Sequence, residues 1–162
     1  MNDLVPQVKI ADPDDKAYQN FLIYLTASPY ADRSENFGKL IRQAVNNPEH
    51  NKASTDDFLI ILRMVVDSAK RVGRAECNRS SLDGFYAGDD ERLAKLVEAG
   101  LIVHDKKTDK IAFTERAVEF LFIITSNLDS ESKQKTPFTL SQFRYVDRSV
   151  LSQDGKTSVH QK

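Results

Sequence analysis

The chain has 162 residues, of which 40% are hydrophobic and 29% are charged, and its net charge is −1. A chain of this length can bury a core without disulfides or structural metals, and its composition is that of an ordinary globular protein. The small net charge excludes a protein whose whole surface binds nucleic acid phosphate, since such a surface carries a large positive excess.

The charges are distributed unevenly along the chain. Residues 1–52 hold six basic and seven acidic side chains, and residues 53–129 hold eleven and fourteen, so their net charges are −1 and −3. Residues 130–162 hold six and three, a net charge of +3. The middle of the chain has the clearest structural pattern and is acidic, so a DNA-binding surface there requires lysine and arginine side chains gathered on one face.

The sequence also limits the expected compartment and cofactors. No segment approaches the roughly 20 apolar residues that span a bilayer, and the first residues lack the basic and apolar regions of a secretory signal. A single cysteine, Cys77, excludes an intrachain disulfide and a cluster of zinc-bound thiolates. We therefore expect a cytoplasmic protein with no membrane contact, no metal and no other cofactor.

Two helices are expected before residue 50. Asp12 and Pro13 are residue types that begin helices, one as the cap and the other as the first helical residue. A second helix is expected over residues 34–45. The apolar stripes that predict the two helices consist of Tyr18, Phe21, Leu22 and Leu25 in the first, and of Phe37, Leu40, Ile41, Ala44 and Val45 in the second.

Residues 55–72 are expected to form the central helix of the core. Residues Ser54 to Asp57 have the pattern of a capping box at its start, and Gly73 suits the left-handed conformation that ends a helix. Apolar side chains lie on several sides of this helix, which predicts burial on several sides. They are Phe58, Leu59, Ile60, Ile61, Leu62, Val65, Val66 and Ala69.

A compact helix is expected from Asp89 to Gly100, with Leu93, Leu96 and Val97 facing the core. Two short apolar runs, 101–103 and 111–113, then flank a polar turn over residues 106–109 and predict a β-hairpin. Thr114 can cap the helix that follows the hairpin.

The last part of the chain has a different composition. Residues 130–162 are expected to form a largely flexible tail, because they are polar and rich in serine and lysine. An apolar island over residues 138–151 interrupts this tail, and the sequence leaves open whether it docks on the body or on a partner. The expected organisation is one domain over 1–129, with an N-terminal helical extension (1–52) and a core (53–129).

The order helix, short helix, helix, hairpin, helix over about residues 55–126 resembles a winged helix-turn-helix domain of bacterial, archaeal or phage regulators. The string from Leu93 to Ile102 is similar to the passage from a recognition helix through a glycine into a wing. The segment from Ile111 to Ala117 resembles the second wing strand and the capped helix after it. The fold implied is mainly α with a small β-hairpin, in which two extra N-terminal helices precede a winged-helix-like core.

The resemblance implies a non-enzymatic transcription regulator that binds DNA as a dimer. Arg92 and Lys95 would lie at the major groove, and Lys106, Lys107 and Lys110 would contact phosphate. The helix that should approach the bases, however, begins with three consecutive carboxylates, which repel a phosphate backbone.

This charge pattern keeps an alternative open, in which the same scaffold is a protein-interaction adaptor or inhibitor that does not bind nucleic acid. Its contacts would come from Phe85 and Tyr86, since exposed aromatic residues often dominate binding energy, and from Asp90 and Glu91. Neither interpretation involves catalysis, because no pair of titratable groups stands out for acid–base chemistry.

Three further features have a simple and a functional interpretation. Cys77 lies between Arg74 and Arg79, whose positive charges could lower the thiol pKa and make a redox sensor; the simpler expectation is a partly buried residue. His104 is expected to be packed or exposed on a strand rather than to bind a metal. Arg71, Arg74 and Arg79 could extend a basic rim beside the wing.

Overall fold

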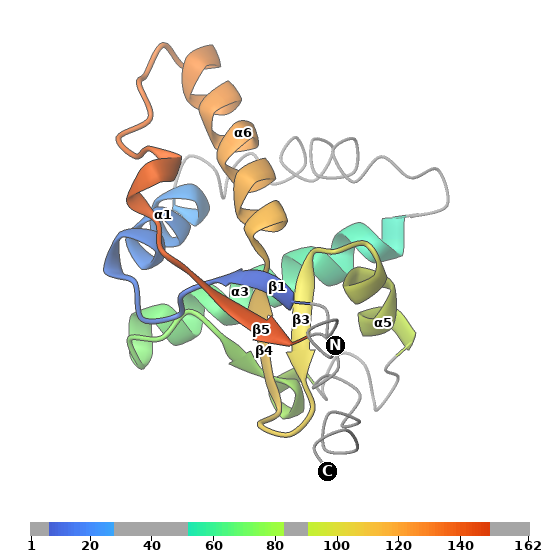
Figure 1. Cartoon of the computed structure of the whole chain (residues 1–162). Coiled ribbons are helices and arrows are strands. Elements are labelled where there is room, and N and C mark those ends of the chain that lie inside the picture. The colour runs from blue at the N-terminus through green and yellow to red at the C-terminus, as the bar shows by residue number, and fades with distance from the viewer. Residues whose placement is uncertain (1–6, 28–51, 83–90, 150–162) are drawn as a thin grey trace.

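The computed structural model describes residues 7–27, 52–82 and 91–149, which form four α-helices and five β-strands (Figure 1). The helices are α1 (Lys16–Thr26), α3 (Lys52–Arg71), α5 (Glu91–Glu98) and α6 (Glu115–Glu131). The strands form two antiparallel sheets, β1 with β5 and β2 with β4 and β3. This mixture of helices with small sheets agrees with the coarse prediction of a mainly helical chain with a hairpin; the helix expected over 34–45 lies outside the described residues.

Helix α3 is buried on several sides, as predicted. Phe58, near its start, packs against Phe113 and Phe120, with ring centroids 5.1 and 5.5 Å apart. Gly73 follows its end with a φ of 79°, in the left-handed region. The predicted capping box is wrong, because the helix already begins at Lys52 and Ser54 lies within it; lysine and alanine favour helix and extend it toward the N-terminus.

Helix α1 begins later than predicted. Its cap is Asp15, whose carboxylate accepts a hydrogen bond from the Ala17 amide at 3.1 Å, whereas Asp12 accepts one from the Asp14 amide in the preceding turn. Asp15 is the better cap because its second carboxylate oxygen also accepts a hydrogen bond from the Arg144 amide at 2.7 Å. The predicted apolar stripe of this helix is buried: Tyr18, Phe21, Leu22 and Leu25.

The predicted hairpin is formed by β3 (Ile102–Asp105) and β4 (Lys110–Phe113). A third strand, β2 (Cys77–Asn78), was not predicted and pairs with the other edge of β4, which gives the spatial order β2-β4-β3. Two residues are too few to show an alternating pattern. A 3₁₀ turn, η3 (Arg79–Leu82), follows β2.

The two ends of the hairpin are fastened to each other. Gly100 ends the α5 segment with a φ of 78°, and its carbonyl accepts a hydrogen bond from the Thr114 hydroxyl at 2.6 Å. The same hydroxyl caps α6 by accepting a hydrogen bond from the Ala117 amide at 3.2 Å, as predicted. The Thr114 amide donates to the Leu101 carbonyl at 3.1 Å. The start of β3 and the end of β4 are therefore held side by side where they join α5 and α6.

The prediction of a flexible tail is wrong for residues 130–149. Helix α6 continues to Glu131, the chain turns at Lys133, and β5 (Tyr145–Ser149) pairs along β1 (Gln7–Ala11). Neither strand was predicted. The apolar island docks on the body, where Phe138 and Phe143 contact the ring of Phe21 with centroid distances of 5.7 and 5.1 Å. Burial of these rings offsets the entropy cost of ordering the segment.

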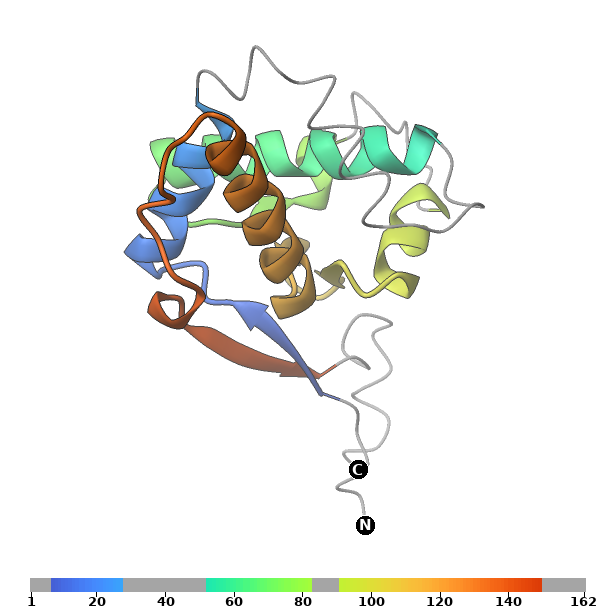
Figure 2. The same ribbon diagram turned by 90° about the horizontal axis from the view of Figure 1, so that it is seen from above.

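The β1–β5 ribbon crosses the hairpin, while α1, α3 and α6 lie together on one side of the ribbon (Figures 1 and 2). Ile10 of β1 packs with Val103 and Ala112, which form the outer face of the hairpin. The opposite face of the hairpin carries Phe113 and Ile111 into the main core. The small sheet is therefore covered on both faces.

A buried carboxylate joins the segment after α6 to the helices. Asp129 is 1% exposed and accepts hydrogen bonds from the Tyr24 hydroxyl at 2.9 Å and the Thr136 hydroxyl at 2.7 Å. Burial and the neighbouring Asp129 raise the pKa of Tyr24 to about 12, so this phenol keeps its proton at neutral pH. The network connects α1, α6 and the chain that leads to β5.

We expect Asp15→Ala to lower the free energy of unfolding by about 2 kcal/mol. The variant loses a helix cap, which costs about 1 kcal/mol, and leaves the Arg144 amide without its acceptor, which costs about as much again. Urea unfolding followed by circular dichroism measures the change. Asp14→Ala is the control, because it removes only an exposed ion pair with Arg74 and should cost less than about 1 kcal/mol. Equal losses in the two variants would contradict the role of Asp15.

Candidate nucleic-acid interface

The tip of the β3–β4 hairpin presents two lysines to solvent. Lys106 and Lys107 are exposed, and in the described part of the chain neither forms an ion pair. The neighbouring aspartates accept hydrogen bonds from backbone amides: Asp105 from the Lys107 amide of the turn at 3.0 Å, and Asp109 from the Ser80 amide of η3 at 3.1 Å. The turn thus presents both lysines to solvent beside two aspartates, of which the Asp109 side chain is 44% exposed.

Asp109 holds the tip in place against the first turn of η3. It adopts a φ of 63°, in the left-handed region that aspartate tolerates better than most residues. Its carbonyl accepts a hydrogen bond from the Arg79 amide at 2.8 Å, and its carboxylate lies 4.0 Å from Nε2 of the buried His104. His104 is thus a packed residue of the hairpin, as the simpler expectation had it.

Helix α5 exposes an acidic face. Leu93 and Leu96 are buried, whereas Glu91, Lys95 and Glu98 are exposed. One cation among two carboxylates gives this face a net negative charge, which agrees with the pattern seen in the sequence. Asp89 and Asp90, the other two consecutive carboxylates, lie outside the described residues.

Arg92, which was predicted to lie at the major groove, is engaged by a buried carboxylate of α3. Its Nε donates to Oδ2 of Asp57 at 3.2 Å, and its Nη2 donates to Oδ1 of the same carboxylate. The Asp57 side chain is 2% exposed and that of Arg92 is 36% exposed. This pair fastens α5 to α3, so we leave Arg92 out of the binding surface proposed below. The sequence interpretation missed Asp57 because it was assigned to a helix cap.

Lys95 and Lys110, the other two lysines predicted to contact DNA, lie on different elements. Lys95 is exposed on α5, whereas the two lysines of the tip lie beyond the four residues of β3. Lys110 is half-buried at the start of β4, next to the turn, and lines the pocket described next. Of the residues predicted for the adaptor alternative, only Glu91 is placed; Phe85, Tyr86 and Asp90 lie outside the described residues.

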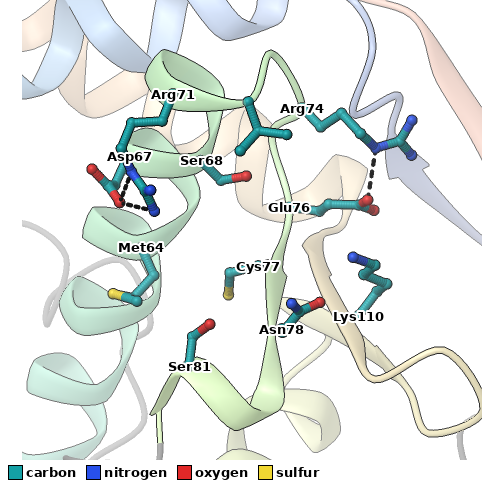
Figure 3. A pocket seen from close by; sticks show the side chains of 11 residues that line it. Met64, Asp67, Ser68, Arg71, Arg74, Glu76, Cys77, Asn78, Ser81 and Lys110 are labelled. Atoms are coloured by element: carbon teal, nitrogen blue, oxygen red, sulfur yellow. Dashed lines mark hydrogen bonds and ion pairs between the residues drawn. The ribbon is translucent and has the colours of Figure 1, made fainter.

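A pocket of about 200 Å³ lies between the C-terminal half of α3 and β2 (Figure 3). Its arginines are paired: Arg71 with Asp67 at 2.8 Å, and Arg74 with Glu76 at 2.8 Å. Arg79, the third member of the predicted basic rim, is buried. The predicted rim is therefore neutralised by carboxylates or withdrawn from solvent, and it does not extend the positive surface of the hairpin tip.

Cys77 lines the same pocket and is buried. Burial raises the pKa of its thiol to about 12, and the nearby carboxylates of Glu76 and Asp109 act in the same direction. Arg74, which was expected to lower this pKa, donates its hydrogen bonds to Glu76 and to Asp14. The thiol keeps its proton at neutral pH, which favours the simpler interpretation of Cys77 over that of a redox sensor.

No three histidine, cysteine or acidic side chains in the part of the chain that the structure describes are grouped so that they could hold a metal ion. None of the helices described is both long enough and apolar enough to cross a membrane.

Comparison with protein families, with curated proteins and with solved structures gave no match to this chain. The function proposed below therefore rests on the sequence and on the geometry of the described residues.

We expect Arg92→Ala to lower the free energy of unfolding by about 2–3 kcal/mol, because it removes a partner of the buried Asp57 carboxylate. Thermal and urea unfolding measure the loss. The matched control is Lys95→Ala, one turn further along α5 and exposed, for which the change should stay within about 0.5 kcal/mol. An Arg92→Ala variant as stable as this control would show that the pair does not hold α5.

Proposed function

We propose that residues 52–131 are a winged-helix domain and that the chain is a regulator that contacts duplex DNA through its hairpin tip. The observation that carries this proposal is the order α3, β2, α5, β3, β4 together with the pairing of β2 to the outer edge of β4. Winged-helix domains have this order of elements and this order of strands. Between β2 and α5, where such a domain has a short second helix, the structure describes the 3₁₀ turn η3; residues 83–90 lie outside the described residues.

The charges favour contact with the DNA backbone over the reading of bases. Lys106 and Lys107 project from the tip, and neutralising phosphates with such side chains releases counterions and gives salt-dependent binding. On α5 only Lys95 is a free cation, and Glu91 and Glu98 surround it. Backbone contacts fix position on a duplex but carry no direct sequence information, so the tip alone gives binding that depends weakly on sequence.

The double variant Lys106→Ala, Lys107→Ala tests this proposal. The logarithm of DNA affinity falls linearly with the logarithm of salt concentration, and each phosphate contact contributes about 0.9 to the slope. Loss of both lysines should therefore lower the slope by about 1.8 for each chain bound. Fluorescence anisotropy of a labelled 20–30 base-pair duplex, titrated at several salt concentrations from about 50 mM upward, measures it.

The matched control is Lys133→Ala, Lys135→Ala, which removes the same charge from the turn after α6. Both lysines are exposed, and Figure 1 shows this turn at the far end of the molecule from the hairpin tip. This control should keep the slope of the original chain. Equal slopes for the two double variants, or no measurable binding at the lowest salt concentration, would contradict contact through the tip.

The acidic face of α5 favours a second candidate, the protein-interaction adaptor. With Arg92 held by Asp57, the exposed carboxylates outnumber the exposed cation on this face, and a basic surface of another protein complements it better than DNA does. The titration above separates the two candidates: absence of DNA binding at low salt removes the first and leaves the second.

A further inference from the structure

The outer side of α6 carries a stripe of exposed residues at helical spacing. They are Arg116, Glu119, Ile123, Asn127 and Ser130. Ile123, in the middle, is 56% exposed and is one of three large hydrophobic side chains exposed in the described part of the chain. A single exposed isoleucine is common on protein surfaces, so Ile123 marks a contact surface only together with the charges around it.

Two exposed charges lie at opposite ends of α6. Arg116 is in the first turn of α6, and Glu131 is its last residue. Both are exposed, and neither forms an ion pair within the described residues. Each also lies at the helix end that disfavours its sign, since the N-terminus of a helix is partly positive and the C-terminus partly negative. A negative charge beside Arg116 and a positive one beside Glu131 would relieve both effects.

We propose that a second copy of this chain supplies these charges, with the two α6 helices antiparallel and a two-fold axis beside Ile123. Arg116 precedes Ile123 by seven residues and Glu131 follows it by eight. At 1.5 Å per residue these are distances of about 10.5 and 12 Å along the axis. Arg116 of one copy therefore comes level with Glu131 of the other, and the symmetry makes this contact twice.

The angular positions agree with this pairing. At about 100° per residue, Arg116 and Glu131 both lie on the same flank of Ile123, at roughly 20° and 80° from it. In an antiparallel helix pair, like flanks of the two helices face each other. Glu119 lies on the opposite flank, where it meets the neutral Ser126 and Ser130 side chains of the second copy, so the two α6 helices themselves bring no like charges together.

The apolar contact is small, so the dimer is weak. A stable interface usually buries at least about 1,200 Å², whereas here one isoleucine from each copy is central and half-buried Phe120 and Phe122 flank it. Association should therefore depend on protein concentration, and added salt should weaken it because two exposed ion pairs contribute. The inference is independent of DNA binding, since the test below reads association in the absence of DNA.

Sedimentation velocity of the full chain over a range of concentrations tests the proposal by charge reversal. Arg116→Glu alone and Glu131→Arg alone each place two like-charge contacts in the dimer, and we expect each to raise the dissociation constant about tenfold or more. The combined variant restores both pairs with inverted sign and should recover association. Lys95→Glu, a reversal at an exposed site on α5, is the matched control and should associate like the original chain.

Ile123→Ser provides a second test that leaves the charges unchanged and should also weaken association. Circular dichroism and thermal unfolding of each variant verify that the fold is retained. A chain that stays monomeric at the highest concentration overturns the proposal. A dimer that the single reversals leave intact, or that the combined variant does not restore, overturns it as well and assigns the contact to another face.

Discussion

Phe58 of α3 and Phe113 of β4 lie with their ring centroids 5.1 Å apart, and neither is exposed. This contact holds the base of the hairpin against the central helix. The hydrogen bonds of Thr114 to Gly100 and Leu101 then bring the entrance and the exit of the hairpin to the same point. The direction of the tip, and hence the exposure of its two lysines, follows from this packing. A smaller side chain at Phe113 would leave a cavity that costs several kcal/mol of stability. It would also loosen β4, the middle strand of the three-stranded sheet, from α3.

Three buried carboxylates join segments that are distant in the sequence. Asp15, Asp57 and Asp129 accept hydrogen bonds from groups 129, 35 and 105 residues away, respectively. A buried carboxylate is costly unless donors surround it, so each of these three is satisfied only when its distant segment is in place. The excess of acidic side chains over residues 53–129 is therefore partly structural, since Asp57 and Asp129 are buried, whereas Glu91 and Glu98 of α5 are exposed.

Elements whose pattern is local could be predicted from the sequence. Helix α3, the hairpin, the Gly100 turn and the Thr114 cap each depend on residues a few positions apart, and the structure contains them. The β1–β5 ribbon could not be predicted, because its strands are short and pair across almost the whole chain. The pairing of Arg92 with Asp57 was missed because Asp57 was assigned to a helix cap. Once Arg92 is engaged by this carboxylate, the candidate site changes from the arginine of α5 to the two lysines of the hairpin tip. The lysines themselves were predicted, but the hydrogen bonds that their neighbouring aspartates accept from backbone amides were not.

We propose that the hairpin tip contacts the DNA backbone, and titration of the ¹⁵N-labelled full chain with a short duplex of arbitrary sequence, followed by amide chemical shifts at low salt, tests this contact. We expect the largest shifts over residues 105–110, with smaller ones at the exposed face of α5 and none in the turn after α6. Shifts concentrated on α6 or on the β1–β5 ribbon, or no shifts at any duplex concentration, would contradict it.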